Sequence, residues 1–214
     1  MTRQRALATC AVALALGCFR TRTVPPVEMY RLVPADSASI DVAPEHLPDG
    51  AVAVARFITP GLYGQRGIVY RLGDAGYAAY PSREWAIPLG EQLGRRTADL
   101  MQQRPPVRGG ALFDPPSRRG FTYVWRGTVR EFEEIDRGDD VFVAVNLEAS
   151  LIRIEDDSIV WSGGRRVERA VPDGTMEGII AGLSAATDEV LVALVDSARV
   201  SIRQKSANGS GAPR

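Results

Sequence analysis

Phe121–Glu133 (FTYVWRGTVREFE) and Asp140–Ile154 (DVFVAVNLEASLIRI) are the two stretches that decide the fold. Apolar and polar residues alternate along both, which is typical of β-strands that cover a core with one face. The polar segment Asp136–Asp140 between them predicts a hairpin turn. The two stretches therefore predict a pair of long antiparallel strands.

A third strand is expected over Ser158–Ala170 (SIVWSGGRRVERA), directly after a second polar turn at Glu155–Asp157. Two consecutive glycines in it, Gly163 and Gly164, predict a β-bulge. The three strands together form an antiparallel meander.

One amphipathic helix is expected before the meander in the sequence, and a second one after it. The first is predicted over Arg83–Gln103 with Ser82 as its cap, although Pro88 requires the regular helix to begin close to it. Its apolar stripe is Trp85, Leu89, Leu93, Thr97 and Leu100. The second begins near Asp173–Met176 and extends as far as Ile202. Its stripe is Met176, Ile179, Ile180, Leu183, Val190, Leu191 and Leu194.

Shorter strands are expected before the first helix, at Met29–Val33, Val52–Ile58, Ile68–Leu72 and Gly76–Tyr80, the last two joined as a hairpin. The elements predict an α+β (mixed α/β) domain: one sheet with a long-stranded antiparallel meander, packed by two main amphipathic helices.

The first residues indicate a secretory signal. Arg3 and Arg5 precede the apolar run Ala6–Leu16, which is too short to span a bilayer, and Gly17 then precedes Cys18. The Ala15–Cys18 sequence resembles the lipobox of bacterial lipoproteins, so Cys18 is predicted to be acylated. No later segment is expected to be long and apolar enough to span a membrane. The alternative is an ordinary secreted protein in which Cys18 is an idle thiol.

This signal sets the expected domain limits. Residues 1–17 form the signal peptide, 18–28 a lipidated linker with Pro25 and Pro26, 29–203 the domain, and 204–214 a disordered, Gly- and Ser-rich tail.

Composition and motifs argue against several classes of function. Without Arg3 and Arg5 the mature chain has 24 basic and 26 acidic residues, a formal charge of −2, which is unsuited to nucleic acid. The single histidine, His46, lies in a Pro-rich loop, and no catalytic triad, zinc motif or phosphate-binding glycine pattern accompanies it. We therefore predict no catalytic, metal-binding or cofactor-binding residues.

Pro60–Leu89 is the stretch with the most unusual content, because it holds four tyrosines, a tryptophan and three arginines. These residue types are favoured where proteins meet partners. The candidate partner surface is therefore Tyr63, Arg66, Tyr77 and Tyr80, which would contact another protein or a second copy of this chain. The alternative is that these aromatic side chains only pack the core.

The same stretch carries a resemblance to a known family. The motifs follow one another in a characteristic order, which is Tyr30–Leu32, Gly61–Leu62, Ile68–Arg71, Tyr80, Trp85 and Pro88–Leu89. A sheet followed by the amphipathic helix Met176–Leu194 completes the pattern. Over Tyr30–Val200 the chain resembles the ABC-type transport auxiliary lipoproteins. It departs from them at Gly67 and at the lipobox position Ala15.

The resemblance implies a non-catalytic lipoprotein that serves an ABC transporter with a mammalian-cell-entry (MCE) domain protein in the periplasm. Such systems move lipids or hydrophobic molecules through the envelope. Cys18 would carry acyl chains such as palmitate. Phe19, in place of Asp, implies the periplasmic face of the outer membrane. The alternatives are an outer-membrane lipoprotein that regulates peptidoglycan synthesis or another envelope machine, and a hydrolase with an unrecognised site.

Overall fold

The computed structural model describes residues 26–33, 47–73 and 75–209, with side chains up to Gln204. Cys18 and His46 lie outside the described residues. In chain order the elements are β1 (Glu28–Tyr30), β2 (Val52–Val54), the 3-10 helix η2 (Gly61–Gly64), β3 (Gly67–Leu72), β4 (Gly76–Trp85), α2 (Leu89–Gln103), β5 (Ala111–Phe113), β6 (Tyr123–Arg137), β7 (Asp140–Arg153), β8 (Ile159–Ala170) and α3 (Met176–Gly209).

A mixed sheet of eight strands organises these elements, and β6 is its centre. On one edge β6 pairs with β7, which pairs with β8, and both pairs are antiparallel. On its other edge β6 receives two short parallel strands, β2 near its beginning and β3 near its end. The pairs β2–β5 and β3–β4–β1 complete the sheet. The predicted meander and the α+β class are confirmed.

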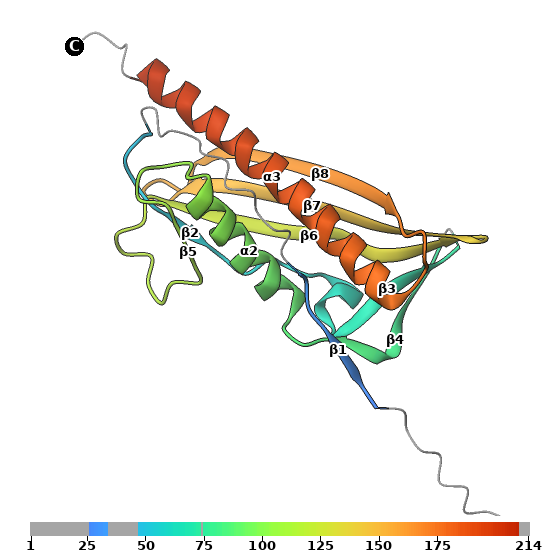
Figure 1. Cartoon of the computed structure of the whole chain (residues 1–214). Coiled ribbons are helices and arrows are strands. Elements are labelled where there is room, and N and C mark those ends of the chain that lie inside the picture. Colours follow the sequence, from blue (N-terminus) through green and yellow to red (C-terminus); the bar gives the residue numbers. More distant parts are fainter. Residues whose placement is uncertain (1–25, 34–46, 74, 210–214) are drawn as a thin grey trace, which may run out of the picture.

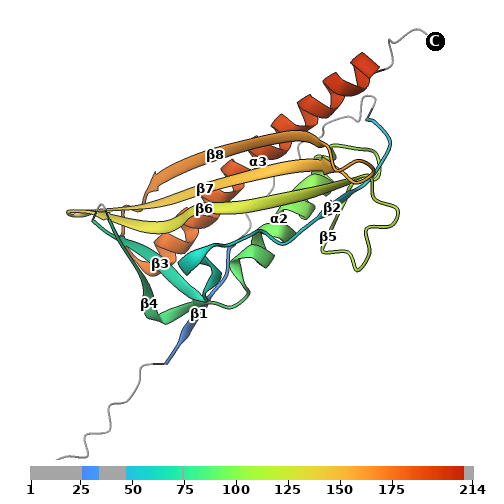
Figure 2. The same cartoon turned by 180° about the vertical axis from the view of Figure 1, so that it is seen from behind.

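Both helices cover the same face of this sheet. Figure 1 shows α2 and α3 in front of the strands, and Figure 2 shows the opposite face, with β6, β7 and β8 in front. Alternation places Val143, Val145 and Leu147 of β7 on the helix-covered face, where they are fully buried. The core therefore lies between the long strands and the two helices.

The long helix α3 contradicts the expectation that no segment after the signal is long and apolar enough to span a membrane. Its stretch Met176–Gln204 reaches a mean hydropathy of 1.7 and qualifies by length and composition as a membrane-spanning candidate. In the fold, 56% of its most apolar window is buried, with Leu183, Val190 and Leu191 against the sheet. The helix begins at Met176, as predicted, because the hydroxyl of Thr175 accepts a hydrogen bond from the Gly178 N–H. It continues to Gly209, beyond the predicted end.

The predicted start of the first helix is wrong. Strand β4 continues to Trp85, because β1 pairs with it in parallel and sets Tyr30 beside Trp85. The helix α2 therefore begins at Leu89, directly after Pro88, which cannot donate a backbone hydrogen bond. Strand β1 is also shorter than predicted, since it ends at Tyr30.

The predicted bulge at Gly163 and Gly164 is also wrong. These residues pair with Ala149 and Glu148 in unbroken register, and the register shift in this pair of strands lies between Leu151 and Ile152. A Cβ atom on Gly163 would come within 2.7 Å of the ring of Trp161. The glycine therefore makes room for an indole ring two residues away on the same face.

Candidate partner surface

The structure divides the four predicted surface residues into two groups. Arg66 and Tyr77 are exposed, Tyr77 by 48% of its surface. Tyr63 and Tyr80 are half-buried and pack against the core. Arg66 immediately precedes β3, whereas Tyr77 pairs with Arg71 near the turn of the β3–β4 hairpin, so the two exposed residues lie at opposite ends of that hairpin.

Tyr63 is held by Glu133, a fully buried carboxylate on β6. Its hydroxyl donates to Glu133, and the Nε of Arg71 donates to the same carboxylate at 2.8 Å. Burial, followed by the hydrogen bond to Glu133, raises the pKa of Tyr63. The guanidinium of Arg71 also lies 5.6 Å from the centre of the Tyr77 ring. These four residues, Tyr63, Arg71, Tyr77 and Glu133, lie on the sheet face opposite the helices.

Tyr80 is held by Glu134, the residue that follows Glu133 in β6, on the helix-covered face of the sheet. Successive strand residues point to opposite faces, and Glu134 pairs with Val143, which contacts α3 through Gly182. The Tyr80 hydroxyl lies 3.0 and 2.9 Å from the two carboxylate oxygens of Glu134. Tyr70 and Arg83 flank the Tyr80 ring. The centres of the Tyr70 and Tyr80 rings are 4.7 Å apart, and the guanidinium carbon of Arg83 lies 4.9 Å from the centre of the Tyr80 ring.

The adjacent carboxylates explain why this region stabilises the fold more readily than it could catalyse a reaction. Glu133 and Glu134 point to opposite faces, so they cannot act on one substrate as acid and base. Among the described residues, no group of three or more His, Cys, Asp and Glu side chains is arranged to hold a metal ion. The arrangement instead attaches η2 and the β3–β4 hairpin to the end of β6.

Glu134 makes the stability of the domain depend on pH. Burial raises the pKa of its carboxyl, although the Tyr80 hydroxyl acts in the opposite direction. The folded state therefore binds this proton more tightly than the unfolded chain does. The resulting stabilisation is present below the unfolded pKa and is lost as the pH rises through the raised folded pKa.

We therefore expect Glu134→Gln to raise the melting temperature at pH 7.5 and to raise it less at pH 4.5. The neutral amide avoids the cost of burying a charge and can still accept the hydrogen bond from Tyr80. Thermal unfolding at both pH values checks this expectation, with Glu155→Gln in the exposed β7–β8 turn as the control. A gain that is equal at both pH values would contradict it.

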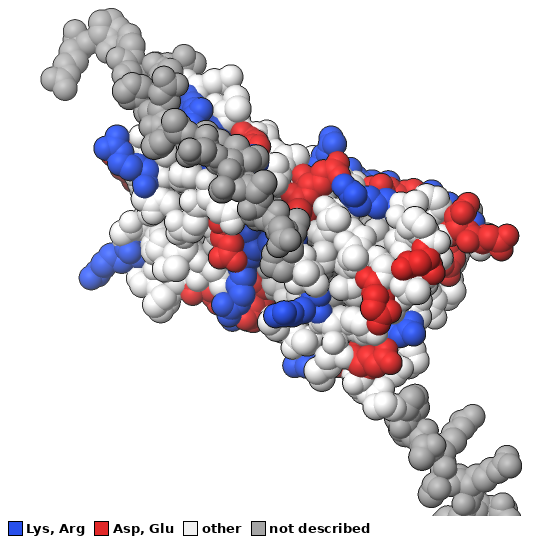
Figure 3. Space-filling view, viewed as in Figure 1, with Lys and Arg blue, Asp and Glu red and all other residues white. Residues whose placement is uncertain are grey.

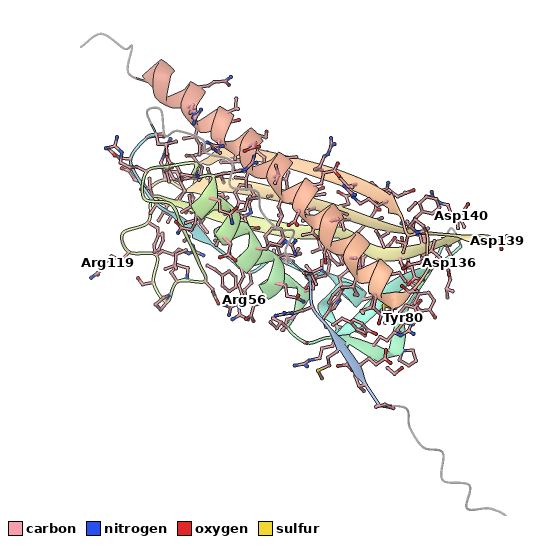
Figure 4. The ribbon with its side chains drawn as sticks, viewed as in Figure 1. Arg56, Tyr80, Arg119, Asp136, Asp139 and Asp140 are labelled. Atoms are coloured by element: carbon pink, nitrogen blue, oxygen red, sulfur yellow. The ribbon has the colours of Figure 1, made fainter. Side chains whose placement is uncertain are left out.

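Other charged side chains are spread over the surface of the domain (Figure 3). Figure 3 shows acidic side chains at the end where the β6–β7 hairpin projects, and Figure 4 places Asp136, Asp139 and Asp140 at that tip. Arg56 and Arg119 lie toward the opposite end in Figure 4. Arg56 is paired with Glu91 at 3.1 Å and with Asp114 at 2.9 Å.

Sequence reasoning missed the two carboxylates that fix this region, because charged residues were not expected in the core. One signal was available: Phe132 and Ile135 flank Glu133 and Glu134, so the apolar pattern continues past the predicted strand end at Glu133. The excess of Tyr and Arg in Pro60–Leu89 supplies the partners of both acids.

Comparisons with known proteins agree with this fold. The chain is similar to the crystal structure of a Xanthomonas campestris protein of family DUF330, with a TM-score of 0.66 and 18% identity over 84% of this chain and 99% of that one. It is also similar to a second crystal structure, of an uncharacterized protein, with a TM-score of 0.62 and 17% identity over 81% of this chain and 99% of that one. No curated protein matches the chain significantly.

A family profile gives the assignment. The profile described as the ABC-type transport auxiliary lipoprotein component matches residues 30–195, from the end of β1 into the second half of α3. This range contains β2 to β8, both tyrosine–glutamate contacts and α2. The chain therefore belongs to the ABC-type transport auxiliary lipoprotein family.

Proposed function

We propose that this chain is a non-catalytic accessory lipoprotein of an ABC transport system built around an MCE-domain protein, which moves lipids or hydrophobic molecules through the cell envelope. The observation that carries the proposal is the family match over residues 30–195. The opposed carboxylates Glu133 and Glu134 also favour it, because each is engaged by a tyrosine of the fold and neither faces a shared reaction site.

The proposed place of action is the periplasmic face of the outer membrane. Cys18 carries the acyl chains, residues 1–17 are removed with the signal, and residues 18–28 link the anchor to the domain. Several acyl chains hold a protein firmly, because each buried CH₂ group contributes about 0.8 kcal/mol.

We further propose that the MCE-domain partner contacts the β3–β4 hairpin through Tyr77 and Arg66. These are the members of the candidate surface that expose their side chains. Tyr63 and Tyr80 instead hold this region to β6 from opposite faces of the sheet, through Glu133 and Glu134. Tyr77→Ala should therefore weaken binding with little loss of stability, whereas Tyr63→Ala should destabilise the fold.

Purification of the tagged chain from bacterial membranes tests the proposal. The wild type should bring with it an MCE-domain protein together with a permease and an ATPase. Cys18→Ala should abolish labelling by a clickable fatty acid and release the domain from the membrane. Tyr77→Ala should remain acylated and keep its melting temperature but lose the MCE-domain protein, at a cost of about 2 kcal/mol in binding.

Different outcomes separate the alternatives. Enrichment of a peptidoglycan synthase without an MCE-domain protein would favour the envelope-regulator function. Undiminished fatty-acid labelling of Cys18→Ala would mean that another residue carries the lipid. Unchanged partner recovery with Tyr77→Ala and Arg66→Ala would place the contact outside the hairpin.

A further inference from the structure

Two large apolar side chains are exposed where the described chain begins, and a third is exposed in the loop between β4 and α2. The exposed fractions are 47% for Val27, 59% for Met29 and 37% for Ile87. Ala86 and Pro88 on either side of Ile87 are exposed as well. A soluble domain gains nothing by placing such side chains together in water, so this group calls for an apolar neighbour.

Strand pairing gathers these residues at one edge of the sheet. β1 runs parallel to β4 and sets Met29 beside Glu84, and the Ala86 N–H donates to the Tyr30 carbonyl at 2.8 Å. The loop that carries Ile87 therefore begins beside Tyr30, the last residue of β1. We call Val27, Met29 and Ile87 the β1 patch.

Two of the charged residues next to the β1 patch, Glu28 and Arg83, are paired with each other, and Glu84 beside Met29 is half-buried. Glu28 lies 3.6 Å from Arg83 and accepts a hydrogen bond of 2.7 Å from the Tyr30 hydroxyl. Arg31 is exposed directly after β1 and offers a cation. An apolar patch with a neighbouring arginine suits the boundary between the headgroups and acyl chains of a phospholipid bilayer.

The length of chain before the patch brings it close to the anchor. Val27 follows Cys18 by nine residues, which span at most about 30 Å when fully extended. Figure 1 shows that β1 and the C-terminal end of α3 lie at opposite ends of the domain. The β1 end is therefore the part of the domain held nearest to a membrane that carries the lipid on Cys18, at a high effective concentration.

The body of the domain would follow the patch rather than swing freely from it. The backbone after β1 is clamped between the helices: the Leu32 N–H donates to Gln92 of α2 at 2.8 Å, and the Val33 N–H to Ser184 of α3 at 3.0 Å. The side chain of Leu32 is buried in the core. Contact of the β1 patch with a bilayer would thus orient both helices and the sheet.

We propose that the β1 patch rests on the phospholipid surface in which Cys18 is anchored, so that Met29 and Ile87 enter the headgroup–acyl boundary and the C-terminal end of α3 points away from the membrane. The proposal rests on the lipid anchor of the proposed function. It adds that the domain binds lipid itself and holds one orientation.

Depth measurements on the full-length acylated chain test this orientation. Loss of Cys10 with the signal and acylation of Cys18 leave the mature wild type without a free thiol, so Met29→Cys and Ile87→Cys each introduce one labelling site. The protein is placed in vesicles of phosphatidylethanolamine and phosphatidylglycerol, labelled with bimane, and quenched by lipids with spin labels at graded depths. Leu112→Cys and Ile159→Cys are matched controls, because both native side chains are exposed, by 52% and 61%, on other strands.

The expected result is strong quenching at Met29 and Ile87, with a depth of about 5–10 Å below the headgroups, and none above background at Leu112 and Ile159. Equal quenching at all four positions in vesicle-bound protein would overturn the docking while leaving the anchor intact. Shielding of the Met29 label from both lipid and water would overturn it in favour of a protein partner or a second copy. Failure of the chain to float with the vesicles would overturn anchor and docking together.

Discussion

Replacement of Arg71 by Met should lower the free energy of unfolding by about 3–5 kcal/mol, because it leaves the buried carboxylate of Glu133 without its cation. Glu133 is fully buried, and Arg71 donates to it from both Nε and Nη2. Methionine keeps much of the apolar stem of arginine, so the loss measures the charge more than the packing. Chemical denaturation followed by circular dichroism gives the value.

Arg130→Met is the matched control for this substitution. Arg130 lies on β6, the strand of Glu133, and forms an ion pair with Glu148 at 2.7 Å, but the two side chains are 53% and 49% exposed. Water and salt screen such a pair, so its removal should leave the midpoint of unfolding close to that of the wild type. Equal midpoints for Arg71→Met and Arg130→Met would show that the carboxylate of Glu133 is hydrated in solution.

The double substitution Arg71→Met with Glu133→Leu separates the loss of the ion pair from the cost of leaving a buried carboxylate unpaired. Removal of both charges eliminates the unpaired carboxylate, so part of the lost stability should return. Tyr63 would lose its acceptor in the double variant, which limits the recovery. The comparison also bears on partner binding, because Arg71 lies beside the exposed Tyr77. A variant that loosens the hairpin would weaken recognition without any contact having been removed.

The long strands could be predicted because their pattern repeats often enough to outweigh local exceptions. Tyr123–Arg137 and Asp140–Arg153 pair along nearly their whole length, and every second β7 residue from Val143 to Leu151 is buried. A single charged or small residue does not disturb so long an alternation. The start of α3 was also predicted, near Asp173–Met176, and in the structure Thr175 caps it.

The short parallel strands depended on partners far away in the sequence. β5 was not predicted, since its three residues, Ala111–Phe113, become a strand only by pairing with β2. Trp85 fitted the apolar spacing of a helix, yet tertiary pairing with Tyr30 places it in β4. Local periodicity cannot distinguish these cases, because the strand hydrogen bonds come from residues more than 50 positions away.

The candidate surface was predicted in composition but not in orientation. Tyr, Trp and Arg, which are favoured at interfaces, were correctly seen as a local excess, yet half of the four named side chains bind carboxylates of β6. Burial of Glu133 and Glu134 decides this, and the burial of an acid depends on which side chains the fold brings to it. The exposed pair, Arg66 and Tyr77, remains a prediction for partner contact.

Trp125→Ala should destabilise the domain by about 3–5 kcal/mol, because it empties a large site in the core. Trp125 is fully buried and stacks on Trp161, with ring centres 5.1 Å apart and an angle of 17° between the planes. Gly163 leaves the space that the second ring occupies. The stacked pair therefore joins β6 to β8 across β7.

Phenylalanine substitutions at the two positions distinguish packing from hydrogen bonding. The Nε1 of Trp161 donates to Ser197 of α3 at 3.1 Å, whereas that of Trp125 has no hydrogen-bond partner within the described part of the chain. Trp125→Phe removes an unsatisfied polar group along with ring volume, but Trp161→Phe removes a hydrogen bond and leaves the Ser197 hydroxyl without its donor. Trp161→Phe should therefore cost about 1 kcal/mol more than Trp125→Phe in denaturant unfolding. The reverse order would mean that the Trp125 indole N–H binds a buried water, whose loss then adds to the cost of that substitution.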